Sequence, residues 1–357
     1  MLALASSLPT TAAEPFWASP SAAQVAGGRW RLSLEGESVG DRVEHSPNAV
    51  GGGFEPVTKR SRYAGGRLTL DWRASPEWHL SGSVGRRSIT FLRDSYTVDG
   101  YHIGLARRLP SPSERTALAL VLDVDARRAD ELYKNSWTEI GGVRLTGASL
   151  FDAADETVML SVNARTRVRP TTHVTTLIGV GRTRATHARL SGVGTDGKGC
   201  RYGFEATASA GEIELLEPCR NVVAFHEAYT SEAGIERRLG FSPGADLAYT
   251  GRVLQGGVAL EHVAGRLGLS LGYVYRRHDR GAFDERIRAR GGTAVEASHT
   301  SSFRLGFAAS RTVELGLGAH YRSTSYLDEL PLLYNAFTND RFAKNVLSFS
   351  GSLTLSF

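Results

Sequence analysis

The sequence has no long apolar run. Its 357 residues are 41% hydrophobic, with a mean hydropathy of -0.21, and no uninterrupted apolar stretch approaches the roughly 20 residues that a membrane-spanning helix needs. A protein that crosses a bilayer on helices is therefore excluded. Two classes remain: a soluble protein, and a transmembrane β-barrel, whose spans are short and half polar.

Cysteine, methionine and lysine are also scarce. The chain has two cysteines and two methionines against 40 glycines, a balance that suits a β-rich protein with many tight turns. Lysine occurs only at Lys59, Lys134, Lys198 and Lys344, so 42 − 4 = 38 of the basic residues are arginine. Codon usage can produce this bias as readily as function can. A formal net charge of +5 and a pI near 9.3 permit an anionic partner without identifying one.

Catalytic and cofactor motifs are absent. Neither H-E-x-x-H nor G-x-S-x-G occurs, and no Cys/His cluster has metal-ligand spacing. The arginines follow strand parity and do not gather into one basic, aromatic-rich patch. We therefore predict no enzyme, no cofactor, no metal and no nucleic acid partner. A barrel wall can still recruit histidines for hydrolysis, and the candidates for that alternative are His226, His278, His299 and His320.

Apolar and polar side chains alternate from Gly28 to the C-terminus. Leu68, Leu70 and Trp72 are separated by threonine and aspartate, and Leu315 and Leu317 by glycine. A period of two predicts extended strands with one apolar and one polar face.

The last strand, residues 346–357, reads V-L-S-F-S-G-S-L-T-L-S-F. Its apolar face carries Phe349, Leu353, Leu355 and Phe357, and its other face is nearly all hydroxyl. Because the last residues of a soluble domain usually fray, little selects for an aromatic terminus there. This ending resembles the C-terminal signature of bacterial outer-membrane β-barrels. The resemblance implies that these four residues are an insertion signal read by the barrel-assembly machinery, and that the strand closes the barrel against the first.

Connection lengths alternate along the chain. Short turns at one rim and long loops at the other are typical of a transmembrane barrel, whereas a soluble sandwich or propeller has no need of this sorting. We predict an all-β fold, a single transmembrane antiparallel up-and-down β-barrel of about 14 strands, with 12 or 16 if weak segments merge or split. The predicted short turns lie near 74–77, 109–114, 169–172, 242–245, 264–266 and 309–312, and the long segments near 38–60, 128–155, 188–223, 279–296 and 326–343.

The chain divides into two parts. Residues 1–27 contain a short apolar stretch followed by small residues, without a basic n-region, and we interpret them as a signal peptide remnant or a disordered N-terminus. Residues 28–357 are assigned to the barrel. The resemblance places it in the bacterial outer membrane, among outer-membrane lipid and lipopolysaccharide.

If the apolar positions face lipid, the residues between them face the lumen. Both charge signs occur there, with arginine in excess. One interpretation is a network of ion pairs that braces the wall or fills the interior. The other is a polar pore whose excess guanidinium groups favour anions. The predicted pore-lining residues are Arg31, Arg67, Arg73, Arg108, Arg165, Arg167, Arg276, Arg304, Arg322, Asp71 and Glu314.

Two functions fit such a barrel. The first is a porin-like channel that passes small polar solutes, with anions favoured. The second is an export, assembly or surface-display barrel that acts as conduit or scaffold for a partner. No plug-sized segment is visible in the sequence, which favours the first. A soluble all-β protein is the remaining alternative.

Cys200 and Cys219 lie in the longest predicted loop, with 219 − 200 − 1 = 18 residues between them. In an oxidising compartment an even pair in one loop is expected to be bridged. A metal site is disfavoured because two cysteines without nearby histidines leave it half filled. We predict a disulfide that holds the loop over or into the pore mouth, with the carboxylates of 212–217 opposite the arginine-lined wall.

Overall fold

The computed structural model describes residues 29–39, 62–91, 94–134, 138–140, 143–240, 242–323 and 346–357. The predictions for residues 1–27 and for most of the segments 38–60 and 326–343 lie outside these ranges.

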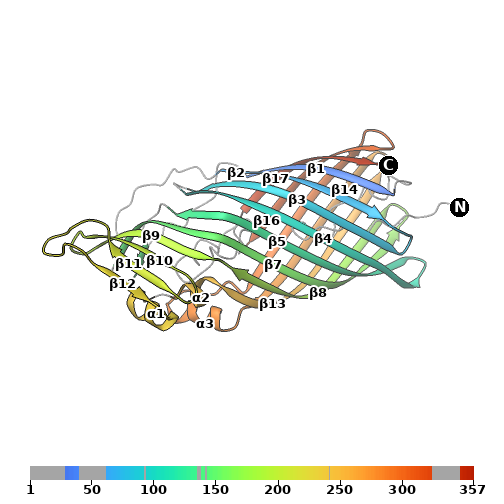
Figure 1. Ribbon diagram of the computed structural model, residues 1–357. Helices are drawn as coiled ribbons and strands as arrows, with labels where there is room; N and C mark the ends of the chain where they lie inside the picture. Colours follow the sequence, from blue (N-terminus) through green and yellow to red (C-terminus); the bar gives the residue numbers. More distant parts are fainter. Residues whose placement is uncertain are drawn as a thin grey trace.

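Twelve antiparallel strands form a closed barrel (Figure 1). The last strand, β17, pairs with β16 on one side and with β1 on the other, where Arg31 lies opposite Ser356. The predicted all-β fold and the closure by the last strand are therefore confirmed. Around the barrel, the strands are β1 (Trp30–Val39), β2 (Arg62–Arg73), β3 (Trp78–Phe91), β4 (Asp94–Ser113), β5 (Thr116–Lys134), β7 (Val143–Arg169), β8 (Thr172–Thr186), β13 (Tyr249–Ala264), β14 (Leu267–Asp279), β15 (Ala297–Ala308), β16 (Val313–Ser323) and β17 (Val346–Ser356).

The barrel has 12 strands and not about 14 because one predicted turn is a helix. The segment 242–245 begins α2 (Pro243–Leu247), where the Ser242 Oγ accepts a hydrogen bond from the Ala245 N–H at 3.0 Å. Proline in the first turn of a helix and serine before it are both favourable. Strand β13 then crosses the barrel as one piece between β8 and β14.

Short connections and both barrel termini lie at one end of the barrel, hereafter the short-turn end. There the Trp30 N–H donates to the Phe357 carbonyl at 2.9 Å, and Gly265 supplies the positive φ of 61° that its two-residue turn requires. The other end carries the helices and the additional strands, and β3 and β4 are joined there by residues 92–93. The short connections are 74–77, 114–115, 170–171, 265–266 and 309–312.

An extension of the sheet continues past the barrel at this other end, seen at the left of Figure 1. The segment 128–155, predicted to be a long loop, mostly continues β5 and β7, which pair from Thr116↔Thr166 to Lys134↔Ala148. The extension consists of the far ends of β5 and β7 together with β6 (Thr138–Ile140), β9 (Arg189–Asp196), β10 (Arg201–Ala206), β11 (Gly211–Leu215) and β12 (His226–Tyr229).

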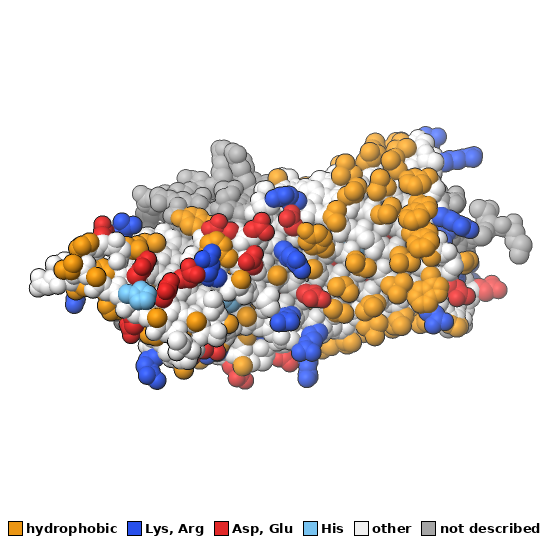
Figure 2. All heavy atoms as spheres, viewed as in Figure 1, with side chains coloured by type: hydrophobic (Ala, Val, Ile, Leu, Met, Phe, Trp, Pro, Cys, Tyr) orange, Lys and Arg blue, Asp and Glu red, His pale blue; other side chains and the backbone are white. Residues whose placement is uncertain are grey.

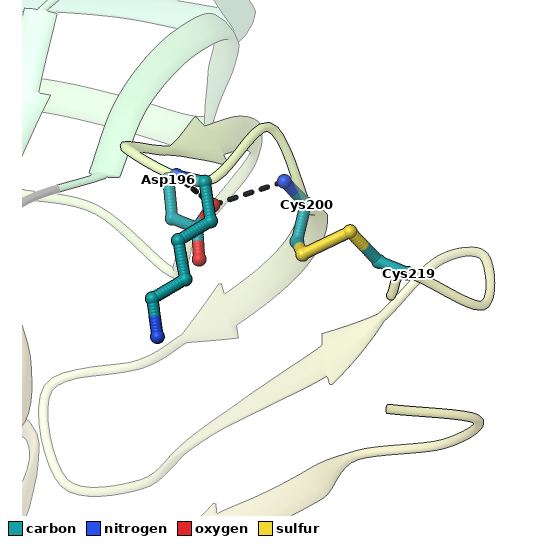
Figure 3. Close-up of a disulfide and its surroundings, with 4 residues drawn as sticks. Asp196, Cys200 and Cys219 are labelled. Atoms are coloured by element: carbon teal, nitrogen blue, oxygen red, sulfur yellow. Dashed lines mark hydrogen bonds between the residues drawn. A yellow bond between two sulfur atoms is a disulfide. The ribbon is translucent and has the colours of Figure 1, made fainter. Parts of the chain in front are cut away.

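The predicted disulfide Cys200–Cys219 is present and joins the start of β10 to the segment after β11 (Figure 3). The Asp196 carboxylate accepts hydrogen bonds from the backbone N–H of Lys198 at 2.8 Å and of Cys200 at 2.9 Å, which fixes the turn before the bridge. The segment 212–217 does not enter the pore mouth as predicted. Its first residues form β11 inside the extension, and Glu217 pairs with Arg201 at 3.5 Å.

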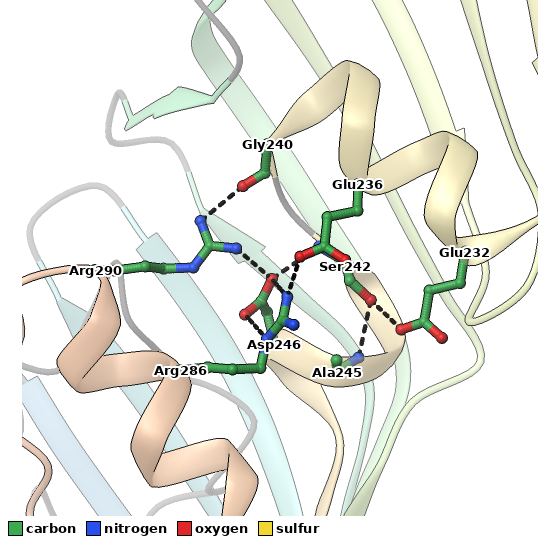
Figure 4. Close-up of polar contacts among 8 residues, drawn as sticks. All are labelled: Glu232, Glu236, Gly240, Ser242, Ala245, Asp246, Arg286 and Arg290. Atoms are coloured by element: carbon green, nitrogen blue, oxygen red, sulfur yellow. Dashed lines mark hydrogen bonds and ion pairs between the residues drawn. The ribbon is translucent and has the colours of Figure 1, made fainter.

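Side-chain ion pairs join the helices α1 (Glu232–Leu239), α2 and α3 (Ala282–Ala289) (Figure 4). The buried Asp246 carboxylate accepts from Arg286 and Arg290, both at 2.8 Å. Arg286 also reaches Glu236 at 2.7 Å, and the hydrogen bond that Arg286 donates to Asp246 raises the pKa of Arg286. No helix among the described residues is both long and apolar enough to cross a membrane.

The outer face of the barrel carries an apolar belt, the broad band of hydrophobic side chains in Figure 2. Ile178 is 74% exposed, and the exposed hydrophobic side chains of β14 run from Leu267 to Tyr275. This stretch of nine residues has a length typical of a spanning strand. Tryptophans lie at the short-turn end, where the rings of Trp30 and Trp72 stack at 5.2 Å. Apolar side chains outside and polar ones inside invert the arrangement of a soluble protein.

Candidate functional site: the barrel interior

The inner face of the barrel is lined by polar and charged side chains that alternate with the belt. On β7, Ser161, Asn163 and Arg165 are buried, while the neighbouring Leu160 and Val162 are exposed. The same parity holds on β17, where Ser348 and Thr354 are buried and Phe349 and Leu353 are exposed. Phe349, Leu353, Leu355 and Phe357 all lie on the exposed face, and their role as an insertion signal stays a prediction.

All the predicted pore-lining residues fall on the inner parity, and several are joined as ion pairs between strands. Arg31 on β1 contacts Asp71 on β2 at 2.7 Å. Arg304 on β15 lies 3.6 Å from Glu314 on β16. Arg276 donates to the Gln255 side chain at 3.1 Å, and Arg67 lies on the same face of β2 as Asp71.

Two pairs join strands that are not direct neighbours. Arg165 on β7 reaches over β8 to Glu261 on β13 at 2.6 Å, with side chains only 8% and 3% exposed. Arg322 on β16 reaches over β17 to Glu37 on β1 at 3.3 Å, and the Ser348 hydroxyl also donates to Glu37. Burial of both partners makes these pairs sensitive to the loss of either one.

Three predicted residues lie apart from this network, at the short-turn end. Arg73 is the last residue of β2, and Arg108 and Arg167 lie near the ends of β4 and β7. The described residues provide no ion pair for any of the three side chains, and Arg108 is exposed. The predicted pore-lining arginines in ion pairs therefore lie in the body of the barrel, whereas these three arginines at the short-turn end have no ion-pair partner among the described residues.

The sequence analysis missed carboxylates that complete the network. Glu261 lies on β13, which follows the segment 242–245 that was predicted to be a turn, so the strand that carries it was not assigned. Arg127 and Asp155 pair at 2.8 Å in a segment that was predicted to be a loop. Strand parity extended over both segments would have found all three residues.

A cluster around His102 is the most enzyme-like part of the wall. The His102 Nδ1 lies 3.2 Å from the Asp125 carboxylate, and its Nε2 lies 3.3 Å from the Ser81 Oγ. Gly104 leaves room for this contact, since a Cβ there would sit 2.5 Å from the Ser81 Oγ. A histidine between a hydroxyl and a carboxylate has the connectivity of a nucleophile, a base and an orienting acid. The other candidate histidines are separate: His226, His278, His299 and His320 lie on β12, β14, β15 and β16.

The extension holds an open cavity of about 440 Å³. Its lining mixes the aromatic side chains of Tyr133 and Phe204 with the carboxylates of Glu205, Glu212 and Glu214. Glu205 is paired with Arg189 at 3.0 Å, and Glu212 lies 3.5 Å from His226. Within the described residues, no group of three or more His, Cys, Asp or Glu side chains is placed to hold a metal ion.

No family model matches the chain. No curated protein matches it either. Among solved structures, the translocator domain of autotransporter NalP from Neisseria meningitidis is similar with a TM-score of 0.49 and 8% identity, over 93% of this chain and 89% of that one. The CymD monoaromatic hydrocarbon channel is similar with a TM-score of 0.42 and 9% identity, over 95% of this chain and 91% of that one. The KdgM porin is similar with a TM-score of 0.37 and 7% identity, over 92% of this chain and 99% of that one. Similarities this low assign no function, which has to come from the barrel's own geometry.

Proposed function

We propose that the protein is an outer-membrane channel that passes small polar solutes and favours anions. The observation that carries the proposal is the inverted alternation in a closed barrel: apolar side chains outside, polar and charged side chains inside. An exposed apolar face around a whole barrel suits lipid, and a polar lumen suits water and solutes. Barrels of about 8 strands are filled by their own side chains and those of about 16 leave a channel, so 12 strands suit a narrow pore.

The preference for anions follows from where charge is unpaired. Arg165 and Arg322 are neutralised by Glu261 and Glu37, so they shape the wall. Arg73, Arg108 and Arg167 at the short-turn end face no such partner among the described residues. Guanidinium groups at a pore mouth raise the local concentration of anions and lower that of cations.

Conductance across a planar bilayer tests this proposal. The refolded protein should give steady channels whose reversal potential in a salt gradient indicates anion selectivity. The triple variant Arg73→Gln, Arg108→Gln, Arg167→Gln should lose most of that selectivity. The matched control is Arg115→Gln, Arg266→Gln, Arg311→Gln, which removes the same charge from exposed turn residues at the same end and should keep it. Absence of conductance, or cation selectivity, would reject the channel.

The same proposal assigns Ser81, His102 and Asp125 to the wall and not to catalysis. Ser81 and His102 are each only 5% exposed, and the described residues place no pair of hydrogen-bond donors around the Ser81 Oγ to hold an oxyanion, which acyl transfer needs. A small sulfonyl fluoride should therefore leave Ser81 unmodified in the folded protein, as judged by mass spectrometry. Labelling that disappears in the His102→Gln variant would instead make the protein a hydrolase candidate.

A second candidate function is a surface scaffold, favoured by the extension, which carries a cavity and a disulfide beyond the belt. A protein that folds and inserts into vesicles but conducts no ions would support the scaffold over the channel.

A further inference from the structure

Exposed arginines lie at the edge of the apolar belt nearest the extension. Figure 2 shows basic side chains beside the band of hydrophobic ones there. Four exposed arginines belong to adjacent strands near this edge: Arg182 and Arg184 on β8, Arg252 on β13 and Arg277 on β14. All four are exposed, and all four lie on the outer parity that the belt residues share. They are called the rim arginines below.

The rim arginines follow the belt without a gap. Val180 is 54% exposed and Leu254 is 52% exposed, and Arg182 and Arg252 are the next outward residues beyond them. Tyr275 precedes Arg277 in the same way. In a barrel that spans a bilayer, the rim arginines lie at the depth of the headgroup layer. The belt residues next to them lie at the depth of the acyl chains.

Two of these side chains face each other. Arg182 and Arg252 are direct Cα partners of β8 and β13, and like charges directly opposite on a sheet are destabilising. The neighbouring outward carboxylates are Glu156, opposite Arg184, and Asp279, opposite Arg252. None of the four arginines forms an ion pair with a described residue. A sheet that keeps two opposed, unpaired arginines is suited to an anion between them.

We infer that the rim arginines bind phosphate groups of membrane lipid. The inference rests on the proposed outer-membrane span. The guanidinium fork matches phosphate oxygens in two-point contacts, and a phosphate between Arg182 and Arg252 offsets their repulsion. The source is the lipid headgroup and not free phosphate, because the same strands present Val180 and Leu254 to the acyl chains of the same molecule. Barrels of this kind have short periplasmic turns and longer extracellular loops, so the proposed span places the rim arginines in the outward leaflet, where the phosphorylated headgroup is that of lipid A.

The test uses the full chain, refolded in detergent, mixed with diphosphorylated lipid A and purified again. Lipid A retained per protein is measured by mass spectrometry. The double variant Arg182→Gln, Arg252→Gln should retain about tenfold less lipid than the wild type. The control is Arg266→Gln, Arg311→Gln, which removes two exposed arginines from the short-turn end and should retain as much as the wild type. Heat-modifiable migration establishes that every variant is folded.

Two further arms identify the ligand. Dephosphorylated lipid A should bind the wild type as weakly as the double variant binds diphosphorylated lipid A. Inorganic phosphate should not displace bound lipid A at comparable concentrations. Equal retention in the double variant, equal binding of the dephosphorylated lipid, or displacement by inorganic phosphate would each overturn the inference. A wild type that fails to insert into vesicles would overturn the proposed function itself, and conductance reports on the channel separately.

Discussion

The barrel and the extension are parts of one sheet that follow opposite rules of burial. In the barrel, leucine, valine and phenylalanine are exposed, while serine, arginine and glutamate are buried. In the extension, Leu150, Leu190 and Ala206 lie side by side on β7, β9 and β10 and are all buried. The glutamates of β11 are exposed there. The extension is therefore built for water on its surface, and the barrel for lipid.

In the proposed membrane barrel, the change from exposed apolar to exposed charged side chains marks where the membrane ends. Strands β5 and β7 run through both regions in one register, apart from Asp130 and Asp152, which are left out of the pairing and where Asp152 has a positive φ of 51°. The register alone therefore does not mark the boundary. The side chains do, at the step from Val180 to Arg182 on β8 and from Leu254 to Arg252 on β13. The rim arginines mark this boundary.

The largest expected difference between the regions concerns ion pairs. Arg165→Gln leaves the Glu261 carboxylate, 3% exposed, buried without its partner, which costs about 3 to 5 kcal/mol. Arg189→Gln in the extension breaks a pair whose glutamate is 44% exposed and should cost less than about 1 kcal/mol. Urea unfolding of the refolded protein in vesicles measures both. Recovery of stability in Arg165→Gln, Glu261→Gln would attribute the loss to the unpaired charge, and equal effects of the two single variants would contradict the burial of the Arg165–Glu261 pair.

The disulfide should stabilise the extension alone. Closing a loop of about 18 residues is worth roughly 3 kcal/mol in the chain-entropy account, and both cysteines lie beyond the barrel. Cys200→Ser, Cys219→Ser should therefore speed proteolysis within 197–223 while the heat-modifiable barrel persists. Loss of the folded barrel band would show that the two regions are not independent.

The smallest expected effect concerns Asp196. The backbone N–H of Cys200 lowers the pKa of this carboxyl below its usual range. A lowered pKa means that the carboxylate stabilises the turn above the unfolded pKa of about 4 and that this contribution is lost as the pH falls through the folded pKa. Asp196→Ala should speed reduction of the disulfide by a phosphine about two- to fivefold at pH 7, and the ratio to the wild type should fall toward one as the pH drops through the lowered pKa of Asp196. A ratio that does not change with pH would exclude the carboxylate as the cause.

Strand parity predicted the closed barrel, because a period of two is visible in the sequence itself, and the residues predicted to line a pore share the inner face, while their role in a pore stays a prediction. It did not predict the strand count, because S-P-G-A-D at 242–246 has the composition of a turn as well as of a helix start. The extension was also missed. Leu190 alternates with polar residues just as belt residues do, and only its pairing with Leu150 on β7 and Ala206 on β10 shows that it faces protein and not lipid.

Partner choice across strands was likewise hidden from the sequence. Arg165 and Glu261 are 96 residues apart and meet only because β7, β8 and β13 lie side by side. The arginines without an ion-pair partner at the short-turn end could not be distinguished from the paired ones in the sequence, because pairing depends on which strands lie side by side.

One matched pair of substitutions tests most directly whether the barrel crosses a bilayer with its apolar face outward. Ile178 in the belt and Val223 in the extension are exposed to a similar degree, 74% and 79%. In lipid vesicles, Ile178→Arg should lower the free energy of unfolding by about 2 to 4 kcal/mol, because a charge at the lipid-facing surface loses its water. Val223→Arg should change it by less than about 0.5 kcal/mol. Equal, small effects of the two substitutions would contradict the account, since they would mean that both side chains face water.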